Sequence, residues 1–203
     1  MLKQTQRHFP HALAASLLLA ALSGCATNPT PTAARAEVKP VAAAAAPAVQ
    51  QTDYYFVIHH ENGRIYPIAD TANYLEFMHT NELIYTRSRV GEGPDGATLV
   101  FGIEKKEADD LAKPAKAELF YDGKFEPTGP FYGEVLKDGR FYVFGNWQDF
   151  KDYQAHGEMI YTFTEVGTGP QGETVIYGLN KDTVKAGRPV ALIERFNALR
   201  KAK

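Results

Sequence analysis

The sequence predicts an α+β fold built by tandem duplication of a β-β-α-β-β unit, with mainly antiparallel sheets, helices packed on them and a C-terminal helix. Residues 63–103 recur as residues 139–179, at a constant shift of 76 positions and without a gap. Each copy also carries an Asn-Gly or Asp-Gly pair and a stripe of apolar residues at helical spacing. Because one such unit buries little apolar surface, the two copies are expected to pack against each other.

Each copy is expected to open with a β-hairpin. Segments rich in β-favouring residues flank Asn62-Gly63 in the first copy and Asp138-Gly139 in the second. Both central residues of a type I′ turn need a positive φ, which asparagine, aspartate and glycine tolerate. A two-residue turn at Asn62-Gly63 would set Glu61 opposite Arg64.

A helix is expected after each hairpin, because apolar residues recur there on one helical face. The stripes consist of Tyr74, Phe77 and Met78 in the first copy and of Trp147, Phe150 and Tyr153 in the second. Asp70 and Asn146 are suited to cap the N-termini of these helices. Asn81 and Gly157 tolerate the left-handed conformation that ends a helix.

A second hairpin is predicted from residues 83–90 and 98–103, with counterparts in the second copy. The loop at residues 91–96 matches the spacing G-x-G-x-x-G of dinucleotide-binding loops. Those loops lead into a helix, whereas here a strand follows, so a tight turn is the better interpretation. After the second copy, a terminal amphipathic helix is predicted from Leu192, Ile193, Phe196 and Leu199.

The chain is therefore expected to divide into five parts. These are a leader (1–24), a tether (25–52), a first repeat (53–116), a connector (117–130) and a second repeat with the C-terminal helix (131–203).

The leader has a cationic start and an apolar run over residues 12–22. Eleven residues make about 16 Å of helix, too short for a hydrocarbon core of about 30 Å, so the run is typical of a signal peptide. It ends in Leu22-Ser23-Gly24-Cys25, which resembles the lipobox of bacterial lipoproteins. The resemblance implies cleavage before Cys25, lipidation of that cysteine and a stable membrane anchor. Ala26 in the next position, rather than aspartate, implies the periplasmic face of the outer membrane.

Residues 26–52 are rich in alanine, proline and threonine and hold too few large apolar residues to form a core. As a coil, 27 residues span about 30 Å. We expect this segment to act as a disordered tether between the lipid and the folded part.

Composition limits the function classes. A formal net charge of −2, without a clustered basic segment, argues against nucleic acid as a partner. The one cysteine excludes an intrachain disulfide. No serine lies in a nucleophile elbow, and the two copies share no catalytic set, so no cofactor is predicted.

Two kinds of candidate binding residues remain. His59 and His60 are candidate metal ligands. However, neighbouring side chains in a strand point to opposite faces, and packing against the sheet is the more common role of such histidines. Aromatic side chains on a rigid sheet are candidate contacts for a glycan or a peptide, although core packing is the alternative. These aromatic candidates are Trp147, Tyr66, Tyr142, Tyr85 and Tyr161.

The run Gly139-Arg140-Phe141-Tyr142-Val143-Phe144, followed by a helix with Phe150 and then by Glu158, resembles the YHS-type module. The resemblance covers about 20 residues in each copy and implies a hairpin followed by a short helix. The cysteines that bind metal in some relatives are missing here, so metal binding does not carry over.

The sequence favours a lipid-anchored periplasmic protein of the bacterial envelope that binds a ligand or has a structural role, without catalysis. Its partners would be the membrane, through the lipid, and an envelope protein or glycan. One alternative is an accessory protein of envelope assembly or transport that binds a ligand between the repeats. Another is a hydrolase of cell-wall or glycan material, which would need an acid or histidine in a concave site.

Overall fold

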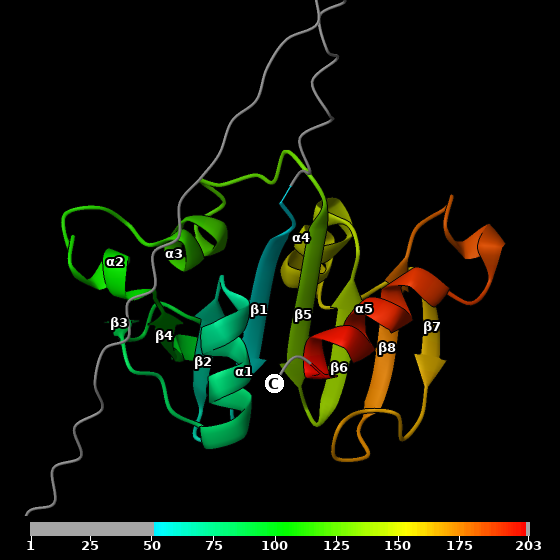
Figure 1. Ribbon diagram of the computed structural model, residues 1–203, viewed down its shortest axis with the longest axis horizontal. Helices are drawn as coiled ribbons and strands as arrows, with labels where there is room; N and C mark the ends of the chain where they lie inside the picture. The colour runs from blue at the N-terminus through cyan, green and yellow to red at the C-terminus, as the bar shows by residue number, and fades with distance from the viewer. Residues whose placement is uncertain (1–50, 202–203) are drawn as a thin grey trace, which may run out of the picture. The chain divides into compact units, whose positions relative to one another are not determined.

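The computed structural model describes residues 51–201, which form an α/β fold with one mixed eight-stranded sheet and five helices (Figure 1). Along the sheet the strands follow the order β3-β4-β2-β1-β5-β6-β8-β7. Cys25 and the expected leader and tether up to residue 50 lie outside the described residues.

The first half of the sheet comes from residues 53–102. Its elements are β1 (Asp53–His59), β2 (Arg64–Ile68), α1 (Thr71–Thr80), β3 (Thr86–Arg89), the 3-10 turn η1 (Pro94–Gly96) and β4 (Thr98–Gly102). Two short helices follow, α2 (Lys105–Ala108) and α3 (Lys116–Tyr121).

The second half repeats this order of elements. It consists of β5 (Phe131–Lys137), β6 (Arg140–Phe144), α4 (Trp147–His156), β7 (Tyr161–Glu165) and β8 (Thr174–Leu179). The 3-10 turn η2 (Val184–Ala186) then leads to the C-terminal helix α5 (Val190–Lys201), which the sequence predicted.

The predicted α+β fold is confirmed only in part, because the structure is an α/β fold with one mixed sheet. The predicted hairpins β1·β2, β3·β4, β5·β6 and β7·β8 are antiparallel, but β2·β4, β6·β8 and β1·β5 pair in parallel. Within each half, the helix carries the chain across the sheet, so the last strand returns beside the second in the same direction. The two halves join edge to edge through β1 and β5, which makes one continuous sheet rather than separate sheets.

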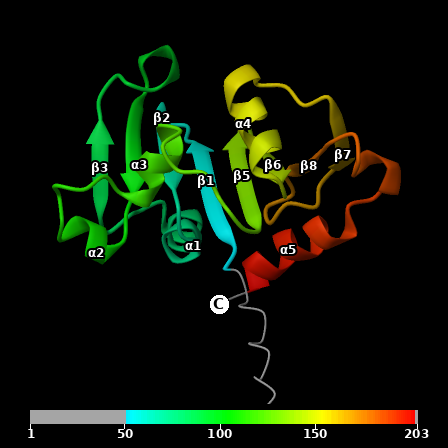
Figure 2. The same cartoon turned by 90° about the horizontal axis from the view of Figure 1, so that it is seen from above.

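Helices cover both faces of this sheet, and each face is covered by one helix from each half. Helices α1 and α5 lie on one side of the strands, which we call the α1/α5 face, and α4 lies on the other (Figure 2). Helix α3 shares a core with α4 on the second side, the α3/α4 face. The central strand β1 is therefore buried on both sides. Tyr55 and Val57 belong to the α3/α4 core, while Phe56 and Ile58 belong to the α1/α5 core.

Local signals place the helices where the sequence predicted them. The Asp70 carboxylate accepts a hydrogen bond from the Asn73 backbone N–H at 2.8 Å, and Asn146 caps α4 in the same way. Asn81, with φ of 59°, and Gly157, with φ of 71°, end the two helices in the left-handed conformation.

The first hairpin turn is longer than predicted. The backbone N–H of His60 donates to the carbonyl of Arg64, so His60 rather than Glu61 lies across from Arg64. Gly63 alone takes the positive φ in this turn, whereas Asp138 and Gly139 both take it in the second hairpin. The extra residue shifts β1 by one position relative to β5.

Candidate functional site

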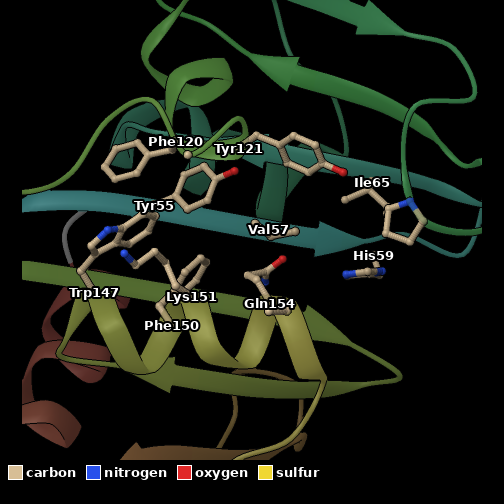
Figure 3. Close-up of a pocket in the computed structure, with 13 residues that line it drawn as sticks. Tyr55, Val57, His59, Ile65, Phe120, Tyr121, Trp147, Phe150, Lys151 and Gln154 are labelled. Carbon is tan, nitrogen blue, oxygen red and sulfur yellow. The ribbon is translucent and has the colours of Figure 1, made fainter.

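The main candidate site is an open groove of about 470 Å³ on the α3/α4 face, which we call the aromatic groove. Its floor is formed by Tyr55, Val57 and His59 on β1 and by Ile65 on β2. Helix α3 forms one wall and helix α4 the other. The wall residues are Phe120 and Tyr121 on α3 and Trp147, Phe150, Lys151 and Gln154 on α4 (Figure 3).

Ring-to-ring packing makes one end of the groove rigid. The ring of Tyr55 stacks on Phe120 at a centroid distance of 4.7 Å and meets the edge of Phe150 at 5.4 Å. Trp147 stacks on Phe150 at 5.7 Å and contacts Phe120 at 5.2 Å. Residues from both halves of the chain thus interlock here, and the groove lies where the halves meet.

Two hydrogen-bond donors of the groove are buried without a partner. The hydroxyl of Tyr55 and the indole Nε1 of Trp147 find no acceptor among residues 51–201. Tyr55 is only 2% exposed, and burial raises the pKa of its hydroxyl well above the ordinary value, so the group stays protonated. A buried donor without an acceptor costs about 1–3 kcal/mol, so both donors favour an incoming acceptor.

The groove has little negative charge. Among the described residues, no aspartate or glutamate lines it, and Lys151 is its charged side chain. The Lys151 ammonium lies 2.9 Å from the exposed carboxylate of Glu126 and 5.7 Å from the centre of the Trp147 ring. At the other end, burial and the nearby charge of Lys137 lower the pKa of His59, so its imidazole is neutral at pH 7.

Helix α3 is short, but an ionic network holds it in place. The buried carboxylate of Glu118 lies 3.0 Å from guanidinium nitrogens of both Arg87 and Arg89 on β3. It also accepts a hydrogen bond from the backbone N–H of Ala115 at 2.8 Å. Burial would raise the pKa of Glu118, but this hydrogen bond and Arg89 outweigh burial and lower the pKa. The wall that carries Phe120 is therefore fixed to the sheet.

The α1/α5 face carries a second polar cluster, which is closed. The carboxylate of Glu134, 1% exposed, accepts hydrogen bonds from the hydroxyls of Tyr74, at 2.5 Å, and Tyr132. The guanidinium of Arg200 donates to both carboxylate oxygens, at 2.7 and 3.0 Å, and lies 3.5 Å from the centre of the Phe196 ring. Burial would lower the pKa of Arg200, but the charge of Glu134 outweighs burial and raises it. Because the carboxylate is saturated, this cluster has a structural role.

The structure does not bring the five predicted aromatic residues together. Of these, Trp147 lines the aromatic groove, and Tyr142 stacks on Tyr153 at 4.8 Å on the same face. Tyr66 is buried on the α1/α5 face, where its hydroxyl accepts a hydrogen bond from the Asn62 side-chain amide. The remaining two lie at opposite edges of the sheet, Tyr85 just before β3 and Tyr161 at the start of β7.

The two candidate metal ligands are also separated. His59 lines the aromatic groove, whereas the ring of His60 packs edge-on against Tyr66 and Phe77, which belong to the core of the other face. Within residues 51–201, no three side chains of histidine, cysteine, aspartate or glutamate gather to hold a metal ion. A metal site at these histidines stays a prediction.

Sequence reasoning missed Phe120 as a groove residue and did not place Tyr55 among the five aromatic candidates. A signal for Phe120 exists, because Ala115, Glu118 and Phe120 recur as Ala191, Glu194 and Phe196 at the same shift of 76. This spacing marks the connecting segment as a counterpart of the C-terminal helix. No signal in the sequence shows that the hydroxyl of Tyr55 is left without an acceptor.

Comparison with protein-family models, with curated proteins and with solved structures finds no match. The lipoprotein and YHS-type resemblances therefore stay predictions. No helix within residues 51–201 has the length and apolar character that crossing a membrane requires.

Proposed function

We propose that this protein is a lipid-anchored binding protein of the bacterial envelope that holds a ligand in the aromatic groove. The observation that carries the proposal is the pair of buried, unpaired donors, Tyr55 and Trp147, at an open groove of about 470 Å³. Binding pockets of this size typically combine apolar walls with a few polar groups that orient the ligand. The groove also lies between the two halves of the chain, where the sequence-based alternative of an accessory binding protein expects a ligand.

Binding is favoured over hydrolysis by the chemistry of the groove. His59 is a titratable group with a lowered pKa in a concave site, as a hydrolase would need. However, no carboxylate of the described residues lines the groove to orient that imidazole or to donate a proton. Aromatic surface with isolated donors supports recognition of a largely apolar ligand.

The binding proposal is tested with Trp147 itself, because the chain contains one tryptophan. Its emission reports what enters the groove, so a screen of small apolar molecules and short peptides can be read directly on the purified chain. Gln154→Arg adds a long charged side chain at the groove and is expected to abolish the emission changes. Gln171→Arg, at an exposed position in the loop between β7 and β8, is the matched control. Emission changes of equal size in both variants would refute the proposal.

We also propose that Cys25 carries the lipid anchor, on the lipobox-like run that ends at this cysteine. Labelling of cells with radioactive palmitate is expected to mark the wild-type chain. Label retained in Cys25→Ser would refute the proposal that this cysteine carries the lipid. Ala26 after the cysteine supports the outer membrane, and fractionation of the two membranes tests that location.

Finally, we propose that the two halves arose by duplication of one β-β-α-β-β segment. The strand registers support this: Arg64 pairs with Thr98 as Arg140 pairs with Thr174, each residue shifted by 76. Expression of the two halves as separate chains tests whether each half folds without the other. A half that folds alone would support its origin as an independent unit.

A further inference from the structure

The aromatic groove has a counterpart on the α1/α5 face that shows which chemical group it lacks. On that face the Tyr132 hydroxyl donates to the carboxylate of Glu134, two residues further along β5. Because the first hairpin turn has one extra residue, Tyr55 on β1 takes the place that Tyr132 has on β5. The residue two positions further along β1 is Val57. The Tyr55 hydroxyl therefore has no acceptor where Tyr132 has one.

Both donor atoms are buried in the free protein, so a ligand that reaches them must enter among the ring side chains and supply an acceptor at two separate points. Figure 3 shows the Tyr55 hydroxyl directed toward Tyr121, away from the indole of Trp147 at the end of the groove. Trp147 Nε1 can only donate a hydrogen bond, and the protonated Tyr55 hydroxyl needs an acceptor as well. Lys151 is already paired with Glu126, and no carboxylate of the described residues lines the groove, so the groove offers these two donors and few acceptors. Its complement is a row of oxygen acceptors on an otherwise apolar, neutral chain.

We propose that the aromatic groove binds a proline-rich, extended segment of a partner protein. This inference rests on the proposed binding function and names its ligand. Proline residues offer carbonyl oxygens but no backbone N–H, so they satisfy the two donors and bring no donor of their own. The polyproline II conformation is formed before binding, and aromatic-lined grooves commonly recognise it.

The size of the groove sets the length of the segment. From Tyr55 to His59 the floor strand advances four residues, about 13 Å at roughly 3.3 Å for each residue. A polyproline II segment rises about 3.1 Å for each residue, so about four residues cover this distance. A hexapeptide is thus long enough to contact both Trp147 and His59.

A glycan fits the groove less well. Each sugar hydroxyl brings a donor that needs an acceptor when it is buried. Among the described residues, the groove has no carboxylate to serve as that acceptor, and the side-chain carbonyl of Gln154 is its main amide acceptor. Glycan binding is therefore the alternative outcome of the test.

The test is a titration of the purified full chain with acetylated, amidated hexaproline, followed by the emission of Trp147. A matched peptide of glycine and serine is the control ligand. Saturable emission changes with hexaproline, and none with the control, are expected. Tyr55→Phe keeps the ring and removes the donor, so it is expected to weaken hexaproline binding about 2- to 10-fold. Tyr54→Phe, on the same strand but packed against the α1/α5 core, is expected to leave binding unchanged.

Different failures separate this inference from the proposed function. If chitotetraose saturates the emission change and hexaproline has no effect, the groove binds a ligand and the proline-rich segment is refuted. Equal affinity of wild type and Tyr55→Phe for hexaproline would also refute it, because the unpaired hydroxyl would then have no part in recognition. Trp147→Phe, measured by calorimetry, is a second check, and unchanged affinity there contradicts the role of the indole donor.

Discussion

The two faces of the sheet use the same aromatic framework, but only one of them is closed. On the α1/α5 face, Glu134 and Arg200 fill the space among the rings and satisfy the hydroxyls of Tyr74 and Tyr132. On the α3/α4 face, the corresponding space is the aromatic groove. The second face is open because it lacks one acceptor and is covered by a shorter helix.

Helix length is the second difference between the faces. Helix α5 has 12 residues and reaches Arg200, which seals the cluster over Glu134. Helix α3 has six residues and ends at Tyr121. The chain then turns away at Gly123, whose φ of 66° is a conformation that glycine adopts readily. Because α3 ends early, the groove stays open, whereas the longer α5 covers the corresponding space on the α1/α5 face.

The largest expected effect comes from breaking the closed face. Glu134→Leu leaves the guanidinium of Arg200 buried without a counter-charge and two tyrosine hydroxyls without an acceptor. We expect a loss of about 3–5 kcal/mol in the free energy of unfolding, measured with urea. Glu194→Leu, at an exposed position of α5, is the control, with less than about 0.5 kcal/mol expected. A loss below about 1 kcal/mol in Glu134→Leu would show that the cluster does not hold this face together.

A smaller effect is expected from a change beneath the groove wall. A Cβ at Gly133 would lie 2.6 Å from Phe150 and 2.7 Å from Phe131, closer than real contacts allow. Gly133→Ala must therefore shift the rings of Phe150 and Phe131, with an expected loss of about 1–3 kcal/mol and altered Trp147 emission. At Gly145 the nearest atom is 3.4 Å away, so Gly145→Ala is the matched control. Equal stability of the two variants would mean that α4 is not packed this closely.

The buried tyrosines of both faces are expected to destabilise the folded chain at alkaline pH. Burial raises the pKa values of Tyr55, Tyr74 and Tyr132, so above about pH 10 the unfolded chain releases protons that the folded chain retains. Stability is then lost as pH rises, at about 1.4 kcal/mol for each pH unit and each such group. Tyr55→Phe is expected to reduce this slope by one group in urea unfolding at pH 10–11. An unchanged slope would indicate that the Tyr55 hydroxyl titrates freely.

The smallest effect is expected at the far end of the groove. Burial lowers the pKa of His59, so below about pH 6.5 the unfolded chain binds a proton that the folded chain does not. The free energy of unfolding should therefore decrease as the pH falls below about 6.5. His59→Gln should remove the part of this decrease that is due to His59. NMR titration of the imidazole is the direct measurement. A pKa at or above the ordinary value would contradict a neutral groove.

Local features of the fold could be predicted from the sequence, whereas its long-range pairing could not. The caps at Asp70 and Asn146 and the stripe of Trp147 and Phe150 follow from short-range patterns, and the structure confirms them. The parallel pairing of β1 with β5 joins residues that lie far apart in the sequence, such as Asp53 and Phe131, so no local pattern indicates it.

The site was predictable only in part for the same reason. Trp147 was a candidate because it lies near a helix start where the first copy has Thr71. Tyr55 lies in an apolar strand whose two faces are both buried, so the sequence does not show which side chains meet a helix. The first hairpin turn is one residue longer than the second, and this difference sets which residue of β1 corresponds to each residue of β5. The difference depends on the turn geometry, which the sequence did not reveal.

The difference between an open and a closed face is measured most directly by two matching substitutions. Tyr132→Phe removes a hydroxyl that donates to a buried carboxylate, and we expect it to lower the free energy of unfolding by about 1.5–3 kcal/mol. Tyr55→Phe removes a hydroxyl without an acceptor, and stability is expected to stay within about 0.5 kcal/mol of wild type or to rise. Equal losses in the two variants would contradict the account, because the Tyr55 hydroxyl would then already have an acceptor in the free protein.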